Sequence, residues 1–333
     1  MISERRHAIL GLIIEHYLRT GEPIGSKTLC QLLPYSISSA TIRNEMAYLT
    51  QLGFLEQRHT SGGRVPSKAS YRYYVDNIMQ EKPISKYETD KINEALSVNS
   101  GDPERLLADA CKLLEEYSHC AAFCATLEDP YDCIQGVDLI PAGNQKAMLV
   151  MLTVGSKIKS SLINMPCALD EDFRKKFYEV SAKFLTGTPL TNVNLALIQS
   201  AVGVAGERIF DMLPALSSLC ALCNEASHSK LTLEGETNLL SHSELGSDLY
   251  KILGLLTEKK QLMELSKSFA NSNSKQLLLI GDENPIYEMK NTSTVIAKYN
   301  YEGGQKAVLG VIGSMRIDYE SILPRINYII NTV

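Results

Sequence analysis

The sequence predicts an α+β protein in which a small helical N-terminal domain precedes a larger body of antiparallel strands and helices. Three observations support this prediction. The first 80 residues alternate short amphipathic helices with one glycine-containing hairpin segment. Strand-like apolar runs lie on both sides of a helix-rich block at residues 187–265. Two tight turns, Gly155-Ser156 and Glu302-Gly303-Gly304-Gln305, each join two such runs as a hairpin.

The composition limits the class of protein. The chain has 333 residues, of which 44% are apolar and 21% are charged, which is typical of a folded protein with more than one domain. Its apolar runs are much shorter than a membrane span, and its first ten residues do not resemble a secretion signal. We therefore expect a cytoplasmic protein that does not enter a membrane and keeps its eight cysteines as free thiols.

The first three helices follow the order of a helix-turn-helix. The first helix, residues 4–20, ends at Gly21 with Pro23 beyond it, and residues 27–33 form a second helix with Ser26 as its N-cap. A third helix begins after Ser38 or Ser39 and ends at Gly53. Its apolar residues are Ile42, Met46 and Leu49. We expect these three to form a narrow buried stripe that leaves the opposite face exposed.

A basic hairpin follows the third helix. Residues 54–66, FLEQRHTSGGRVP, have the glycine turn and the positive charges of a short β-ribbon. A recognition helix followed by such a ribbon is the layout of a winged helix-turn-helix, which binds DNA. A fourth helix begins near Ser67, and we expect its tyrosines to pack on the first helix rather than to stack on bases. This domain is predicted to span residues 1–82.

The exposed start of the third helix carries side chains that suit base recognition. Arginine pairs well with guanine, asparagine with adenine, and the methyl group of threonine with that of thymine. The ribbon supplies residues suited to phosphate or minor-groove contact. The predicted DNA-binding residues are Lys27, Ser38, Ser39, Thr41, Arg43, Asn44, Arg58, His59, Thr60, Ser61 and Arg64. The alternative is that these charges are merely solvated.

The distribution of charge weakly favours the same interpretation. The net charge is −5, but the first 80 residues contain nine Lys and Arg against six Asp and Glu, so that they carry +3 and the remainder carries −8. A mildly basic end on an acidic body suits a protein that places one end on phosphate.

The rest of the chain alternates strands and helices. Helices are expected at 86–96, 103–117, 170–185, 195–222, 245–269 and 318–330, and strands at 120–127, 146–154, 157–165, 230–234, 276–281, 293–301 and 306–312. The apolar helices in the middle suggest a separate unit. We predict a body formed by residues 83–186 and 266–333, interrupted by an inserted helix-rich domain at 187–265.

Motifs for catalysis or metal binding are not found in the sequence. The six histidines have no metal-ligand spacing, and there is no P-loop, HExxH, GxSxG or dinucleotide fingerprint. We therefore expect neither an enzyme nor a bound cofactor or metal. Cys220 and Cys223 form one CxxC pair, which suits buried thiols better than half of a zinc site or a redox pair.

Several segments resemble the family of the heat-inducible transcription repressor HrcA. The resemblance is most specific in YLRTGEPIGSKTL, SSATIRNEMAYLTQLGFLEQRHTSGGRVPS and YRYYVD, and it continues in LTVGSKI, LEGETNLLS, IGDEN and GVIGSMRIDY. It therefore covers the whole chain. Two positions depart from the family pattern: Ser314-Met315 stands where Pro-Thr is usual, and Ser39 where Pro is usual. Neither departure involves Thr41, Arg43 or Asn44.

The resemblance implies a function and a set of partners. Members are bacterial repressors of groE- and dnaK-type chaperone operons that bind an inverted repeat, CIRCE, as homodimers. Their body is GAF-like and carries an inserted dimerisation domain, and the chaperonin GroEL is thought to keep them active. In this chain we expect the dimer surface on the apolar helices of the insert. The residues concerned are Val202, Ile209, Phe210, Leu213 and Leu216.

Two other interpretations remain open at this point. In the first, the chain is a one-component repressor whose C-terminal body senses a metal, a thiol oxidant or a small ligand, with Cys220 and Cys223 as the natural detectors. In the second, the winged helix binds protein instead of DNA.

Overall fold

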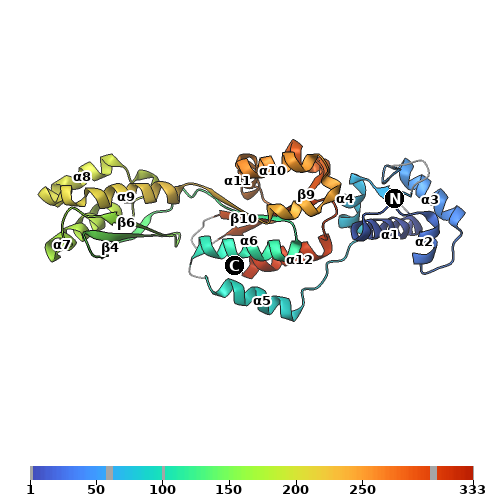
Figure 1. Cartoon of the computed structure of the whole chain (residues 1–333), viewed down its shortest axis with the longest axis horizontal. Helices are drawn as coiled ribbons and strands as arrows, with labels where there is room; N and C mark the ends of the chain where they lie inside the picture. Colours follow the sequence, from blue (N-terminus) through green and yellow to red (C-terminus); the bar gives the residue numbers. More distant parts are fainter. Residues whose placement is uncertain (1–2, 58–62, 100–101, 301–305, 333) are drawn as a thin grey trace.

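The computed structural model describes residues 3–57, 63–99, 102–300 and 306–332. Three units lie in a row (Figure 1). The N-terminal domain is at one end, the central body contains the C-terminal helix, and an inserted unit forms the opposite end. Helices and antiparallel strands together make an α+β protein, as the sequence predicts. Within the described ranges, the longest helices are too short or too polar to cross a bilayer.

The N-terminal domain contains four helices and a two-stranded ribbon. In chain order these are α1 (Glu4–Thr20), α2 (Ser26–Leu32), α3 (Ser39–Gln51), β1 (Leu55–Glu56), β2 (Val65–Pro66) and α4 (Lys68–Asn77). Gly21 ends α1 in the left-handed conformation, with φ of 72°, as its sequence position predicts. Ser26 is the first residue of α2 and Gly25 is its N-cap, so the prediction of Ser26 as the cap was wrong by one residue.

The body is a five-stranded antiparallel sheet between two layers of helices. The strands are β3 (Ala121–Thr126), β7 (Lys230–Glu234), β8 (Gln276–Ile280), β9 (Thr292–Asn300) and β10 (Lys306–Ser314), in the order β7-β3-β10-β9-β8. Helices α5 (Lys86–Ser97), α6 (Pro103–Ser118) and α12 (Tyr319–Thr332) share an apolar cluster with one face. Helices α10 (Asp248–Glu258) and α11 (Lys260–Ala270) share another with the opposite face. Residues alternate between the two clusters along β3, as expected for a sheet covered on both sides.

The insert leaves the body after β3 and returns at β7, and these two strands pair with each other. It consists of a three-stranded antiparallel sheet, β4 (Ile134–Pro141), β5 (Lys146–Thr153) and β6 (Ile158–Asn164), with helices on one face. The helices are α7 (Glu171–Val180), α8 (Leu195–Ala205) and α9 (Ile209–Ser227), and a π-helical turn at Ser181–Leu185 extends α7. The predicted hairpin around Gly155-Ser156 is confirmed as β5 and β6.

The predicted boundaries of the insert, 187–265, were wrong at both ends. The hairpin β5–β6 belongs to the insert, because its inner face packs on α9 in the insert's own apolar cluster. Helices α10 and α11 belong to the body, because their apolar residues pack on its sheet. Strand β4 was not predicted. The spacing of apolar residues predicts that a helix has an apolar face. It does not predict which sheet that face will cover, and so could not assign α10 and α11 to the body.

Candidate nucleic-acid interface

Helix α3, which carries the predicted base-reading residues, lies in the domain at the end of the molecule opposite the insert (Figure 1). Arg43 and Asn44 are exposed, and neither side chain has a hydrogen-bond or ion-pair partner among the described residues. The predicted stripe of Ile42, Met46 and Leu49 is confirmed as buried. Arg43 and Asn44 are therefore held on a well-packed helix while their functional groups remain available.

The first turn of α3 is organised by its N-cap. The Ser38 hydroxyl accepts a hydrogen bond from the Thr41 backbone N–H, with 3.1 Å between oxygen and nitrogen, and lies 2.8 Å from the Thr41 hydroxyl. This bond satisfies one of the N–H groups that a helix start leaves without a partner. Ser39 and Thr41 are half-buried, so they offer less surface than Arg43.

A clamp from α1, which the sequence analysis missed, fixes the middle of α3. Arg6 Nε donates to Glu45 Oε2 at 2.6 Å, and Arg5 lies 3.6 Å from the same carboxylate. The Arg6 guanidinium also lies 3.7 Å from the centroid of the Tyr48 ring, which adds a cation–π contact. Glu45 thus faces α1, and its negative charge is compensated beside the surface that carries Arg43.

The ribbon is joined to the segment between α1 and α2. Arg64 N donates to Ile24 O at 3.0 Å and Ile24 N donates to Arg64 O at 3.2 Å, which forms an antiparallel bridge. A Cβ on Gly63 would lie 2.5 Å from Ile24 O, so only glycine allows this approach. Arg64 is half-buried, and its Nε has no partner among the described residues. The predicted contacts Arg58, His59, Thr60 and Ser61 lie outside the described residues.

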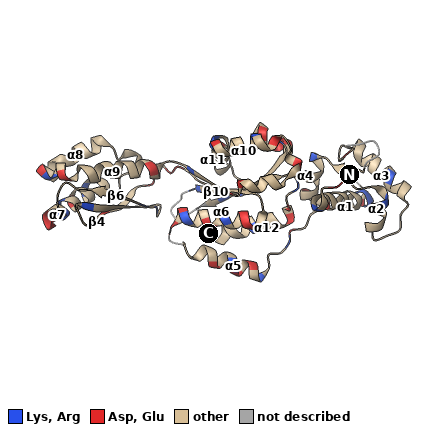
Figure 2. Ribbon diagram, viewed as in Figure 1, with Lys and Arg blue, Asp and Glu red and all other residues tan. Residues whose placement is uncertain are grey.

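Intramolecular ion pairs use much of the positive charge of this domain. Arg5 and Arg6 pair with Glu45, whereas Lys68 and Arg72 pair with Asp282 and Glu283 of the body. Lys27 is exposed at the start of α2 and has no ion pair among the described residues. Figure 2 shows that acidic residues are concentrated on the body and the insert. The end with α2 and α3 is therefore the part of the molecule that repels the negative charge of phosphate least.

The predicted dimer residues divide into two groups. Val202, Phe210 and Leu213 are exposed, Phe210 at 73%, and they line a shallow apolar groove between α8 and α9. Leu216 and Ile209 are buried, at 1% and 6%, in the insert's own core, although Ile209 also lines the groove. The assignment of all five residues to a dimer surface stays a prediction. Because α9 packs on both α8 and the sheet, part of its apolar surface is used inside the protomer.

The CxxC pair lies in a poor environment for a thiol sensor. Burial raises the pKa of Cys220, and burial together with the neighbouring Cys220 and Asp132 raises the pKa of Cys223 to about 12. A protonated thiol is a weak nucleophile and a weak metal ligand. Across the ranges that the structure describes, no group of three His, Cys, Asp or Glu side chains is placed to hold a metal ion.

A family model and two curated relatives identify one family, and a solved structure shares the fold. The model of the HrcA protein C-terminal domain matches residues 104–323. A heat-inducible transcription repressor HrcA from Lachnoclostridium phytofermentans is 32% identical over 97% of this chain and 94% of its own length. The one from Acetivibrio thermocellus is 30% identical over 98% and 94%. A crystal structure of a hypothetical protein, 22% identical, has the same fold with a TM-score of 0.76 over 99% of this chain and 97% of its own.

Proposed function

Since the chain belongs to the HrcA family of heat-inducible transcription repressors, we propose that it represses groE- and dnaK-type chaperone operons in the bacterial cytoplasm. It would bind a CIRCE-type inverted repeat as a homodimer. The N-terminal domain would act as a winged helix, with α3 in the major groove and the ribbon on the adjacent backbone. The body would be a GAF-like domain and the insert a dimerisation domain.

One observation carries the DNA-binding part of this proposal. The exposed face of α3 presents Arg43 and Asn44 without intramolecular partners among the described residues, while Arg6 and the Ser38 cap hold the helix that carries them. A fixed helix with free arginine and asparagine side chains suits bidentate contacts to guanine and adenine. Such preorganisation limits the entropy lost on binding.

The dimer is supported by the apolar groove of the insert. Val202, Phe210 and Leu213 expose apolar side chains side by side, which is unusual on a monomer surface. A two-fold axis through this groove would pair each α8–α9 surface with its copy. The resulting protein symmetry would match the symmetry of an inverted repeat.

The family resemblance also implies that the repressor depends on a chaperonin. The insert also exposes apolar side chains on the outer face of its sheet, among them Ile158 and Leu162. A chaperonin that binds such surfaces would protect the protomer before assembly, and heat-unfolded proteins would compete for it. Adding GroEL with ATP to freshly refolded protein should then raise the fraction that binds operator DNA, and an unfolded competitor should reduce this gain.

A DNA-binding titration at fixed salt tests the central proposal. Fluorescence anisotropy would compare an inverted repeat, a single half-site and a scrambled duplex of equal length. We expect the inverted repeat to bind at least about 1,000-fold more tightly than the scrambled duplex, as for other specific regulators, with two protomers per duplex. Equal affinity for all three DNAs would refute a sequence-specific repressor.

The one-component sensor is the second candidate. A cavity of about 600 Å³ between α1 and the body offers space for a small ligand. The thiol version is less well supported, because both Cys220 and Cys223 have raised pKa values. Operator binding by the Cys220→Ser, Cys223→Ser double variant, with and without zinc or peroxide, tests the version that senses metal or oxidant through these thiols. A response of the wild type that the variant lacks would favour the sensor.

A further inference from the structure

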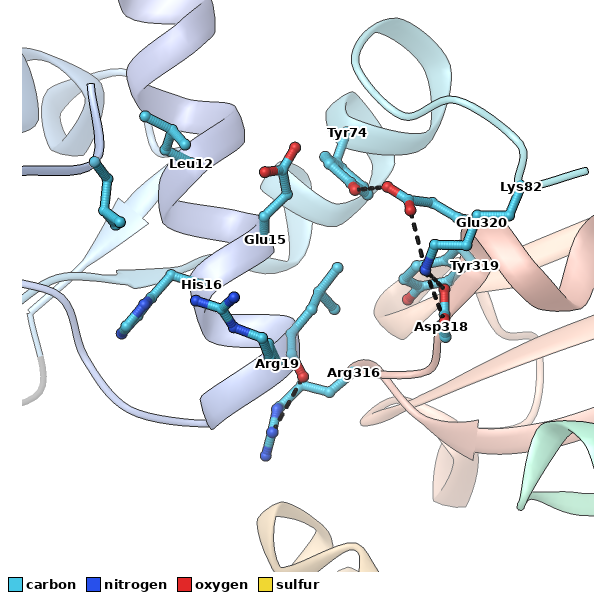
Figure 3. Close-up of a pocket in the computed structure, with 12 residues that line it drawn as sticks. Leu12, Glu15, His16, Arg19, Tyr74, Lys82, Arg316, Asp318, Tyr319 and Glu320 are labelled. Carbon is cyan, nitrogen blue, oxygen red and sulfur yellow. Dashed lines mark hydrogen bonds and ion pairs between the residues drawn. The ribbon is translucent and has the colours of Figure 1, made fainter. Parts of the chain in front are cut away.

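The N-terminal domain and the body meet in a junction with both apolar and charged contacts. Tyr71 and Tyr74 of α4 belong to the same apolar cluster as Tyr319 of α12. Beside them, the cavity of about 600 Å³ is lined by α1 on one side and by the start of α12 on the other. Figure 3 shows Arg316 reaching from the body to the end of α1 across one margin of this cavity.

Arg316 binds the last turn of α1 through two of its three guanidinium nitrogens. Its Nε donates to Tyr17 O at 3.1 Å and its Nη2 donates to Leu18 O at 3.2 Å. Tyr17 O also accepts from Gly21 N at 2.9 Å, so Arg316 adds a second donor there. Leu18 O, in contrast, lies in the last turn, where helix carbonyls lack partners within the helix. A cation at this end also interacts favourably with the helix dipole. The guanidinium lies 5.5 Å from the centroid of the Tyr17 ring as well. One side chain of the body therefore caps a helix of the N-terminal domain.

A polar network in the body holds Arg316 in place. Arg316 Nη1 lies 3.4 Å from Glu244 Oε2, and the buried Ser314 hydroxyl accepts from Arg316 N at 3.2 Å and donates to Glu244. His242 Nδ1 lies 3.1 Å from the same hydroxyl. Although burial raises the pKa of Glu244, bonds from His242 and Ser314 and the charge of Arg316 lower it overall to about 2. The carboxylate is therefore ionised at neutral pH.

The sequence of α1 accommodates this contact. At Gly21, a Cβ would lie 2.6 Å from Arg316 Nη1, and φ of 72° already disfavours other residues. Gly21 therefore has two roles: it ends α1 in the left-handed conformation, and its lack of a side chain leaves room for the Arg316 guanidinium beside the helix end.

A second anchor joins α4 to the body. Arg72 Nε donates to Glu283 Oε1 at 2.8 Å and its Nη2 donates to Leu278 O at 2.7 Å. Lys68 Nζ lies 3.0 Å from Asp282 Oδ1. With anchors on both α1 and α4, the N-terminal domain is held against rotation about either helix.

We propose that Arg316 is a positioning residue for operator recognition. Through α1 and the Arg6 clamp on α3, it fixes the direction of the recognition helix relative to the body. In a homodimer this direction sets the distance and angle between the two recognition helices, and so the half-site spacing that the dimer accepts. The inference rests on the proposed function and adds to it the residue that determines spacing.

Operators with altered spacers provide the test. Inserting about five base pairs, half a helical turn, moves one half-site to the opposite face of the DNA. With a rigid junction, we expect the wild type to lose at least about tenfold in affinity, equivalent to about 1.4 kcal/mol. Arg316→Ala should reduce this loss to about threefold or less, because a loosened domain can reach either site. Its affinity for a single half-site should stay within about twofold of wild type.

Matched variants separate positioning from general loss of structure. Arg316→Lys keeps the charge but lacks the planar fork that serves two carbonyls and a carboxylate, so it should also relax the spacing preference. Arg72→Ala, at the second anchor, should act in the same direction. Arg105→Ala is the control, because Arg105 is exposed and its one ion pair among the described residues is with Asp102 in the same helical turn. Circular dichroism melts would confirm that each variant is folded.

The outcomes distinguish the two proposals. If wild type binds no inverted repeat, the proposed function fails. If wild type discriminates between spacers and the folded Arg316→Ala and Arg316→Lys variants do so equally, the positioning role is refuted while the function stands. Weaker binding to every DNA, with unchanged spacer discrimination, would equally refute the positioning role.

Discussion

Replacing Arg43 by alanine tests the assignment of α3 as the recognition helix. Arg43 is exposed and has no partner among the described residues, so truncation should change the free energy of unfolding by no more than about 0.5 kcal/mol. A bidentate arginine–guanine contact contributes about 1–3 kcal/mol of discrimination. The substitution removes this contact in both half-sites, which are far enough apart for the losses to add. We therefore expect a loss of about 2–6 kcal/mol, at least about 30-fold in affinity.

The assay is fluorescence anisotropy with a labelled inverted repeat at one salt concentration, together with symmetric base substitutions in both half-sites. The wild type should discriminate at one base pair where Arg43→Ala does not. Arg19→Ala is a suitable control, because Arg19 is also exposed and without an ion pair among the described residues. It lies beside the cavity at the C-terminal end of α1, whereas the N-terminal end of α1 contacts α3. If Arg43→Ala binds within about threefold of wild type with the same base preferences, α3 does not read the operator as proposed.

Arg64→Ala should behave differently, although it lies in the same domain. If Arg64 contacts phosphate, its loss should weaken binding to all sequences similarly and lower the salt slope of the binding constant by about one per half-site. Phe210→Asp should give monomers in sedimentation equilibrium, because it places a charge in the α8–α9 groove; a dimer that persists would place the interface elsewhere. Gly310→Ala should destabilise the body by about 1–3 kcal/mol in urea unfolding, since its Cβ would lie 2.6 Å from a backbone oxygen, whereas Gly254→Ala, with open space, should be neutral or stabilising. The hydrogen bond from Arg325, with those from Ser85, lowers the pKa of Glu88 from 4.5 to about 2, so this ion pair stabilises the fold above about pH 4.5 and is lost as the pH falls towards 2. Glu88→Gln should therefore cost up to about 1 kcal/mol at pH 7 and nothing near pH 2; an equal cost at both pH values would contradict the role of charge.

The elements of this fold could largely be predicted from local pattern, but their grouping could not. Apolar spacing located α3 and its buried stripe, and the glycine turn located the β5–β6 hairpin. The strand β4 was missed, since its exposed positions include Ile140 and its apolar alternation is therefore incomplete. The division between body and insert depends on the pairing of β3 with β7, about 100 residues apart in the sequence. Local periodicity contains no information on such long-range pairing.

The functional site also combines features that local sequence predicts with contacts between distant residues that it does not. Arg43 and Asn44 could be proposed from the sequence because the proposal depends only on their position on one helix. The roles of Arg6 and Arg316 could not, because their partners lie 39 and 299 residues away in the sequence. An arginine looks the same in a sequence whether it binds DNA, caps a helix or pairs with a carboxylate. Only the geometry separates Arg43, which has no partner in the described part of the chain, from Arg72, which is held by Glu283.

The N-terminal domain has less positive charge available for DNA than its composition suggests. Four of its basic side chains, Arg5, Arg6, Lys68 and Arg72, neutralise carboxylates within the chain, so few remain for phosphate. A single domain should therefore bind DNA weakly, and non-specific binding should be weak as well. Tight binding then requires two domains that reach their half-sites together, and the gain from the second domain depends on how well it is preoriented. Lys68 and Arg72, which are unavailable for DNA contact, are also side chains that hold the domain against the body and so preorient it.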